Sequence, residues 1–252
     1  MRYISSKENK IYKEAKKLLS HFGRAKSGLF LAEGKRITDD AIQSGAVNHI
    51  IISESYTGEI PDILTYRFPD KLFSDISDTK SSQGIVAVCS AQSKSASDIS
   101  GNLLLICDGI SDPGNLGTMI RTAECAYFDG VVLLKGCVDA YSPKTVRSTM
   151  GSIFRIPIYR IETYQLDMLA DYDIAAAMLE DAKNLFDTAF QEKTAIIIGN
   201  EAHGLSAEVV SFANKRIKIP MRKGVSSLNA GVAAGIILYE VYRQIKMGDG
   251  CV

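Results

Sequence analysis

Cysteine and histidine are scarce in this chain, and neither forms a pattern that would hold a metal. The cysteines are scattered, odd in number and without a CxxC pair, which argues against a zinc site or a disulfide framework; they are Cys89, Cys107, Cys125, Cys137 and Cys251. Only three histidines are present, so a histidine metal cage is not expected either. We therefore expect no metal.

Long apolar runs are also missing. No stretch reaches the roughly 18 uninterrupted apolar residues that a membrane-spanning helix needs. The N-terminal residues MRYISSKENK contain no apolar signal core. We expect a cytoplasmic protein with no membrane partner. Its 252 residues, 46% hydrophobic and 23% charged, are enough for one large domain or two smaller ones.

The net charge of zero hides an uneven distribution. Residues 1–36 carry ten Lys or Arg and three Glu, a net charge of +7, so the remaining residues carry −7. A basic end on a neutral protein suits a polyanion such as RNA; a solvated, lysine-rich helix face is the equally weighted alternative. The residues that we expect to contact RNA are Lys7, Lys10, Arg24, Lys35 and Arg36.

Apolar periodicity divides the chain into two regions. The first is predicted to contain helices over 7–20, 35–44 and 71–77 and strands over 28–32, 49–53 and 84–89. Residues 90–102 are rich in Ser, Ala and Asn and indicate a linker. We place a small N-terminal α/β domain at 1–92, the linker at 93–102 and a second domain at 103–252.

The second region alternates apolar strands with helices. Its strands are expected at 103–107, 130–134, 153–158, 173–178, 194–198 and 215–219, and its last helix at 228–245. Near-continuous apolar strands indicate a sheet that is covered on both faces, and their alternation with helices indicates a parallel α/β sheet.

Three polar loops follow predicted strands of the second region, where ligands of open α/β sheets bind. In the first, residues 108–121 (DGISDPGNLGTMIR), Asn115 is placed to cap the next helix. In the second, residues 199–206 (GNEAHGLS), Gly199 would let a ligand approach the backbone, Glu201 would cap or contact substrate, and His203 is interpreted as a bystander. The third, residues 219–235 (IPMRKGVSSLNAGVAAG), holds Ser227 and Asn229 where the last helix begins.

Taken singly, these loops are explained by turns and helix caps. In combination, DPGNLGxxxRTA, IGNExxGLS and IPMxxGxxSLN resemble the SpoU/TrmH family of the SPOUT methyltransferase superfamily, over residues 103–246. Residues 28–36 (GLFLAEGKR) resemble the family's substrate-binding domain, which has a fold like ribosomal protein L30e. The resemblance implies a C-terminal trefoil knot in the parallel α/β sheet, a homodimer, and S-adenosylmethionine (AdoMet) bound in the knot.

The resemblance also implies roles for residues. The cofactor would lie against Gly199, Ile219, Met221 and Leu228, held mostly by backbone groups. Arg121 matches the catalytic arginine, and the other polar positions of the catalytic site are matched by Asn115, Glu201, Ser227 and Asn229. A guanidinium stays protonated across the pH range in which proteins work, so we expect Arg121 to orient the reacting oxygen and stabilise its charge.

The implied activity is methyl transfer from AdoMet to a ribose 2′-hydroxyl of RNA. Ribosomal RNA is favoured over transfer RNA because an extra N-terminal domain is common among members that modify rRNA. One departure concerns Ser226, since family members often carry an acidic residue there. The alternatives are a non-catalytic RNA-binding protein, a base methyltransferase of the same superfamily and a tRNA 2′-O-methyltransferase. A dinucleotide-dependent oxidoreductase is disfavoured by the absence of GxGxxG.

Overall fold

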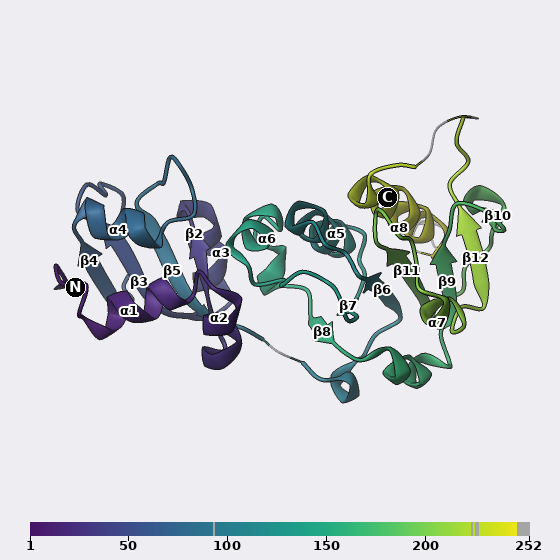
Figure 1. Ribbon diagram of the computed structural model, residues 1–252, viewed down its shortest axis with the longest axis horizontal. Helices are drawn as coiled ribbons and strands as arrows, with labels where there is room; N and C mark the ends of the chain where they lie inside the picture. The colour runs from purple at the N-terminus through teal and green to yellow at the C-terminus, as the bar shows by residue number, and fades with distance from the viewer. Residues whose placement is uncertain (93, 223, 225–226, 246–252) are drawn as a thin grey trace. The chain divides into compact units, whose positions relative to one another are not determined.

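The computed structural model describes residues 1–92, 94–222, 224 and 227–245 (Figure 1). The chain forms two compact units, the first made of residues 1–92 and 139–155 and the second of residues 93–138 and 156–252. Residues 139–155 thus pack with the first unit, a grouping that the expected boundaries do not include. The domain boundaries at 92 and 103 stay a prediction.

The first unit contains a five-stranded mixed sheet with the order β1-β4-β3-β5-β2. Strands β1, β4 and β3 are parallel, and β5 runs antiparallel to both β3 and β2. The strands are β1 (Arg2–Tyr3), β2 (Leu29–Glu33), β3 (Val47–Ser53), β4 (Thr65–Phe68) and β5 (Ile85–Ser90). The helices are α1 (Lys10–Lys17), α2 (His21–Ser27), α3 (Lys35–Gln43), α4 (Asp70–Ile76), α6 (Pro143–Ser148) and the 3₁₀ helix η2 (Ser152–Phe154).

Both faces of this sheet are buried, because successive side chains of a strand point to opposite faces. On one face, Ile51 of β3 packs in a cluster with Tyr12 and Leu18, from α1 and the residue after it. On the other face, Ile50 and Ile52 pack with partly buried apolar residues that include Ile42 of α3. The hydrophobic core of the first unit therefore has two layers.

The sequence prediction of the first unit missed several short elements. The helix expected over 7–20 ends at Lys17, and a second helix follows because Ser20 caps it by accepting from the Gly23 amide. Strands β1 and β4 were not predicted. The prediction of a strand over 153–158 is wrong for most of its length. Gly151, with a φ of 91°, turns the chain into the 3₁₀ helix η2, which takes up the start of the expected strand. A strand begins only after Pro157.

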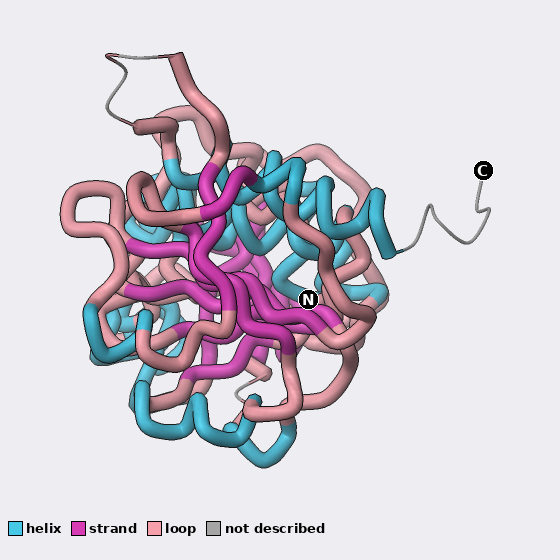
Figure 2. Tube along the Cα trace, turned by 90° about the vertical axis from the view of Figure 1, so that its right-hand side faces the viewer, coloured by secondary structure: helices cyan, strands magenta, loops and turns pink. Residues whose placement is uncertain are grey.

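The second unit contains a seven-stranded parallel sheet with the order β10-β12-β9-β11-β6-β7-β8, which confirms the predicted fold class. Figure 2, which turns this part of the chain towards the viewer, shows strands inside and helices around them. The strands are β6 (Leu103–Asp108), β7 (Gly130–Leu133), β8 (Ile158–Arg160), β9 (Asp173–Ala177), β10 (Lys183–Asn184), β11 (Thr194–Gly199) and β12 (Lys215–Lys218).

Helices cover this sheet and include three 3₁₀ helices. They are η1 (Ala96–Asp98), α5 (Pro113–Cys125), η3 (Thr163–Leu169), η4 (Leu185–Asp187), α7 (Ala207–Val210) and α8 (Ala230–Ile245). Helices α5 and α8 pack side by side, and α8 also contacts β11 (Figure 1). Leu104 and Ile106 of β6 pack instead with Leu169 of η3 and Val209 of α7. Helical segments on both sides explain why β6 and β11 are apolar along nearly their whole length.

The parallel register brings the polar loops together. Strands β6 and β11 are neighbours, with Cys107 opposite Ile198 and Asp108 opposite Gly199. The first and second polar loops therefore leave the sheet at the same point of its carboxyl edge. Strand β12 lies one strand further on, beyond β9.

No helix of the described residues has the length and apolar character needed to cross a bilayer. Within those same residues, no group of three or more His, Cys, Asp or Glu side chains is arranged to hold a metal ion. The four described cysteines are free thiols. Cys251 lies outside the described residues.

Candidate active site

The start of α5 sets the position of Asn115. The N-cap of the helix is Asp112, whose side chain accepts from the Asn115 amide at 2.8 Å, and Pro113 follows at the first helical position. The expectation that Asn115 caps this helix is therefore wrong. Because Asp112 accepts the free backbone N–H at the start of α5, the side chain of Asn115 is not needed as a cap and can bond elsewhere.

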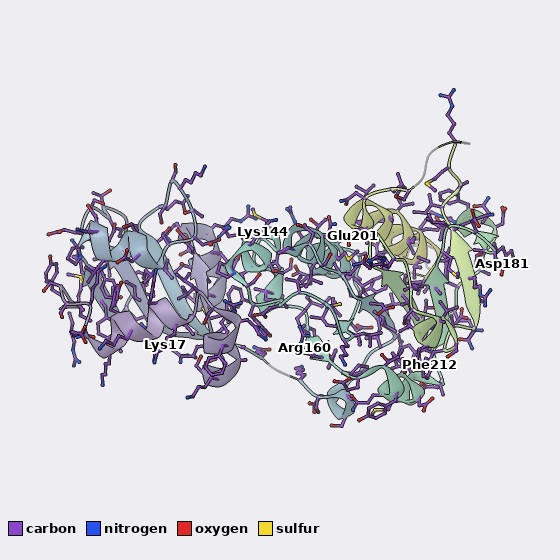
Figure 3. The ribbon with its side chains drawn as sticks, in the orientation of Figure 1. Lys17, Lys144, Arg160, Asp181, Glu201 and Phe212 are labelled. Atoms are coloured by element: carbon purple, nitrogen blue, oxygen red, sulfur yellow. The ribbon has the colours of Figure 1, made fainter. Side chains whose placement is uncertain are left out.

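The Asn115 side chain joins two other loops. Its Nδ2 donates to Glu201 Oε1 at 2.6 Å, and its Oδ1 accepts from Asn229 Nδ2 at 2.9 Å. Asn229 Oδ1 in turn accepts from the Val232 amide at 3.2 Å, in the first turn of α8. Glu201 lies beside α5 and α8 (Figure 3). An ionised carboxylate only accepts, so this chain of bonds fixes the orientation of both asparagine amides.

Asn200 organises the loop after β11. Its Nδ2 donates to the carbonyl of Gly109 at 2.7 Å, in the loop after β6. Its Oδ1 accepts from the amides of Ala202 and His203, and its backbone pairs with Gly204. The side chain thus ties the two loops together and holds the backbone on both sides of Glu201.

Gly199 is needed for packing within the same loop. A Cβ atom there would lie 2.6 Å from the carbonyl carbon and oxygen of Gly204 and 2.7 Å from the Leu205 amide nitrogen. The space beside its Cα is therefore filled by protein backbone. The prediction that Gly199 leaves room for a ligand is therefore corrected: its missing side chain leaves room for the backbone of Gly204 and Leu205. Gly199 does line the cavity described below.

The start of α8 is held close to α5 by a small residue. A Cβ atom at Gly231 would lie 3.2 Å from Thr118 Cγ2 on α5 and 3.2 Å from Asn229 Oδ1. Absence of a side chain at Gly231 therefore lets the two helices approach and brings Asn229 to Asn115. Ser226, where the sequence departs from the family pattern, lies outside the described residues.

A cavity of about 550 Å³ opens at the carboxyl edge of the sheet, among the ends of β9, β11 and β12 and the start of α8. This volume lies within the range of about 300–1,000 Å³ that is typical of small-molecule sites. All four residues expected to hold the cofactor line it, and so do two of the expected polar residues; these six are Gly199, Ile219, Met221, Leu228, Glu201 and Ser227.

One wall of this cavity carries no residue that we predicted from the sequence. Residues 177–181, at the end of β9 and just beyond it, line the cavity together with the loop after β11. Within this stretch Asp181 has a φ of 49° and forms an ion pair with Arg216 at 2.7 Å. The only available signal was the position of β9, since the stretch contains no recognisable motif. His203 also lines the cavity, with an exposed side chain.

Arg121 stands apart from the cavity lining. It is exposed on α5, six residues after Asn115, which corresponds to about 9 Å along a helix. No described residue forms an ion pair or hydrogen bond with its guanidinium group. The guanidinium is therefore available to a bound substrate.

The basic residues expected to contact RNA have different surroundings. Lys10 and Arg36 are exposed, Lys7 pairs with Asp75 at 2.6 Å, and Lys35 pairs with Asp39 at 2.5 Å. Arg24 differs, since its side chain is only 7% exposed and donates to Asp139 at 2.8 Å and to the Leu18 carbonyl at 2.7 Å. Arg24 thus serves to hold the first unit together.

Comparison with known families identifies both regions. Residues 102–239, more than half of the chain, match the SpoU rRNA Methylase family, and residues 9–87 match the MRM3-like substrate binding domain. The chain therefore belongs to the SpoU rRNA methylase family. The family resemblance inferred from the three motifs is confirmed.

Relatives match along nearly the whole chain. The 23S rRNA (guanosine(2553)-2'-O)-methyltransferase RlmP of Bacillus subtilis is 33% identical, over 96% of this chain and 99% of that protein. The mitochondrial rRNA methyltransferase 3A of Danio rerio is 31% identical, over 95% of this chain and 69% of that protein.

Solved structures share the same fold. The AdoMet-bound rRNA methyltransferase from Sinorhizobium meliloti has a TM-score of 0.86 and 28% identity, over 96% of this chain and 97% of that one. The SpoU methyltransferase AviRb from Streptomyces viridochromogenes, in complex with AdoMet, has a TM-score of 0.83 and 27% identity, over 94% of this chain and 98% of that one.

Proposed function

We propose that this protein transfers a methyl group from AdoMet to a ribose 2′-hydroxyl of ribosomal RNA. The single observation that carries the proposal is the cavity at the carboxyl edge of the sheet, with the Glu201–Asn115–Asn229 chain of hydrogen bonds beside it. The relatives support the RNA substrate, because RlmP is by name a 2′-O-methyltransferase of rRNA.

The residues of the cavity fit AdoMet. Ile198, Ile217, Ile219 and Leu228 supply apolar walls suited to an adenine ring, and Glu201 supplies a negative charge suited to a cationic ligand. AdoMet-bound neighbours support the same assignment. The group supplies an activated methyl on a sulfonium. The residues that we propose to hold it are Gly199, Ile219, Met221 and Leu228.

The chain's own residues must then position and activate the 2′-hydroxyl, which is a weak nucleophile. We assign to Arg121 the orientation of this oxygen and the stabilisation of negative charge that develops on it. Its free guanidinium donors support this role. A guanidinium stays protonated across the pH range in which proteins work, so it does not act as the base that removes the proton.

Glu201, Asn115 and Asn229 are proposed to form the fixed polar wall of the site. The amide of Asn115 bridges the other two residues, so the wall is held in one arrangement before substrate arrives. Ser227 lies at the cavity, next to Leu228, and completes the polar set.

The first unit is proposed to hold the RNA. Its exposed cations Lys7, Lys10 and Arg36 and the half-exposed Lys35 would contact phosphates, which makes RNA affinity depend on salt. Arg24 is left out of this surface because it is buried and bonded to Asp139. The match of residues 9–87 to a substrate binding domain supports the assignment.

Three further expectations remain proposals: the trefoil knot, the homodimer and a cytoplasmic location. The knot would be formed by the chain between β11 and α8, which runs out to β12 and returns to pack against α5. An exposed apolar strip supports the homodimer. It contains Val232 and Tyr239 of α8, and Tyr127, which stacks on Tyr242 with ring centroids 5.3 Å apart.

Calorimetry with AdoMet tests the cofactor site. Wild type is expected to bind with a micromolar Kd, and Leu228→Pro, which removes a backbone N–H at the cavity wall, is expected to lose measurable binding while keeping its thermal transition. Absence of binding to folded wild type would contradict the proposal and favour an RNA-binding protein without catalysis.

A further inference from the structure

A small cavity of about 210 Å³ lies in the first unit, at the start of α3. Ile37 and Met150 give it apolar walls, and Met150 is 39% exposed, so the cavity opens to solvent. Arg36, Arg147 and Gln83 line the rest. None of these residues belongs to the catalytic site described above.

Arg147 has an unused hydrogen-bond donor at this cavity. Its Nη2 pairs with Asp78 Oδ2 at 2.8 Å, whereas its Nη1 is buried and has no hydrogen-bond partner among the described residues. Buried polar groups of proteins are nearly always bonded, so an unpaired guanidinium nitrogen indicates a missing acceptor. A ligand with an acceptor atom would meet this requirement.

The charge around the cavity argues against a bare anion. Lys35, Arg36 and Arg147 are balanced by three carboxylates, namely Asp39, Glu33 and Asp78. The Glu33 carboxylate accepts from the hydroxyls of Ser77, Thr79 and Ser82 and from the Asp78 amide. Burial would raise the pKa of Glu33, but these bonds outweigh it and lower the pKa, so the negative charge persists near neutral pH.

A locally neutral cavity with apolar walls and a guanidinium group suits a nucleobase. Unpaired RNA bases stack on arginine planes and apolar side chains and are hydrogen-bonded along their edges. Arginine also binds the carbonyl oxygen and ring nitrogen of a purine edge. A phosphate on the same nucleotide would be near Arg36, which is exposed.

We propose that this cavity takes one unpaired base of the RNA substrate, with Arg147 Nη1 donating to an acceptor on the base edge and Ile37 and Met150 contacting the ring. The inference rests on the proposed function for its RNA substrate. It adds to that function a base-reading site outside the catalytic centre. Arg147 is then a residue that contacts substrate without touching the reacting atoms.

Nuclear magnetic resonance of the full-length protein tests this site directly. The methyl groups of Met150 and Ile37 are isotope-labelled, and the protein is titrated separately with GMP, AMP, UMP, CMP and ribose 5-phosphate. We expect saturable shifts of both methyl signals with at least one nucleotide and none with ribose 5-phosphate. Equal shifts with ribose 5-phosphate would identify a phosphate site, and no shift with any nucleotide would leave the cavity without a ligand; either result overturns the proposal.

A matched pair of variants tests Arg147. Arg147→Met removes the unpaired donor, whereas Arg155→Met removes an arginine that pairs with Asp40 at 3.5 Å and does not line the cavity. We expect the Kd of the responding nucleotide to rise about tenfold in the first variant, as for loss of one hydrogen bond to a charged group, and to stay within about twofold in the second. Equal effects would overturn the role of Arg147.

AdoMet calorimetry on the same samples separates the two proposals. The cavity for AdoMet lies in the second unit, so Arg147→Met is expected to bind AdoMet as wild type does if it is folded. If Arg147→Met does not fold, Arg147→Lys, which keeps a positive charge beside Asp78 but lacks the Nη1 donor, takes its place in the titration and is expected to weaken nucleotide binding; an unchanged Kd in that variant would overturn the role of Arg147. Wild type that binds AdoMet but shows no nucleotide shifts would overturn this inference and leave the proposed function standing.

Discussion

The side-chain amide of Asn115 donates to the Glu201 carboxylate at 2.6 Å, although 86 positions separate the two residues in the chain. Parallel pairing of β6 and β11 makes this contact possible, because it brings the loops after both strands to one edge of the sheet. Asn229 adds the start of α8 to the same contact. One side chain therefore aligns all three loops that the sequence motifs define.

Asn115→Asp tests that alignment. The change keeps the size of the side chain but turns the donor toward Glu201 into a second carboxylate, so attraction becomes repulsion. A hydrogen bond to a charged group contributes about 1.5–3 kcal/mol, so we expect kcat for methyl transfer to fall about 10- to 100-fold. Asn214→Asp is the matched control, because Asn214 Oδ1 accepts from the Ile174 amide and a carboxylate keeps that role. Equal kcat values in the two variants would refute the alignment.

Arg121→Lys separates charge from geometry. Lysine keeps the positive charge but lacks the planar fork of donors, so we expect kcat to fall by about 100-fold or more with little change in the Kd of AdoMet. Arg160→Lys, at another exposed arginine of the same unit, is expected to be nearly silent. Steady-state kinetics and calorimetry give both quantities. Near-full turnover by Arg121→Lys would show that the guanidinium fork is not needed.

Two glycines of the second unit should respond to alanine in opposite directions. Gly199→Ala places a Cβ 2.6 Å from the Gly204 backbone, so we expect the free energy of unfolding to fall by about 1–3 kcal/mol. Gly235 lies in α8 with nothing within 4 Å of its Cβ position, so Gly235→Ala is expected to stabilise by about 0.5–1 kcal/mol. Urea unfolding measures both. A tolerated Gly199→Ala would mean that the loop after β11 packs differently.

Asp139 makes the first unit sensitive to acid. Burial alone would raise the pKa of its carboxyl, but hydrogen bonds with His21, the Tyr141 amide and Arg24 outweigh it and lower the pKa. A lowered pKa in the folded state gives stability that is present above the unfolded pKa of about 3.9 and is lost as pH falls through the folded value.

Asp139→Asn should therefore flatten the acid-induced loss of stability below about pH 4. It should also destabilise the protein by about 3–5 kcal/mol at pH 7, since the buried Arg24 guanidinium loses its charged partner. Urea unfolding between pH 3 and 7 measures both effects. Asp171→Asn, which removes an exposed ion pair with Lys193, is expected to change little. Equal effects of the two substitutions would contradict the structural role of Asp139.

The parallel sheet of the second unit could be predicted because its strands are apolar along their length. This pattern is visible in the sequence and does not depend on knowing the tertiary contacts. The motifs also named residues that line the cavity, such as Met221 and Leu228. The predicted N-cap of α5 was wrong because Asp112 and Asn115 are both favourable capping residues. Only the path of the backbone decides which of the two caps the helix.

Other features depend on contacts between distant residues, which local patterns do not encode. The count of charges led us to place Arg24 on an RNA-binding surface. Its burial depends on contact with Asp139, which lies 115 positions further along the chain. The cavity wall at 177–181 carries no motif, and its position follows from the pairing of β9 with β11. The grouping of residues 139–155 with the first unit is likewise set by contacts with β2 and α3.

A direct assay of methyl transfer to RNA tests the proposed activity. Protein-free ribosomal RNA is incubated with the protein and AdoMet labelled in its methyl group, and the RNA is then hydrolysed in alkali. Alkaline cleavage needs a free 2′-hydroxyl, so ribose methylation leaves the label in an alkali-resistant dinucleotide. We expect that product from the wild type and its loss in Arg121→Ala. Label released in mononucleotides would show methylation of a base, and an unlabelled RNA with a folded, AdoMet-binding protein would contradict the activity.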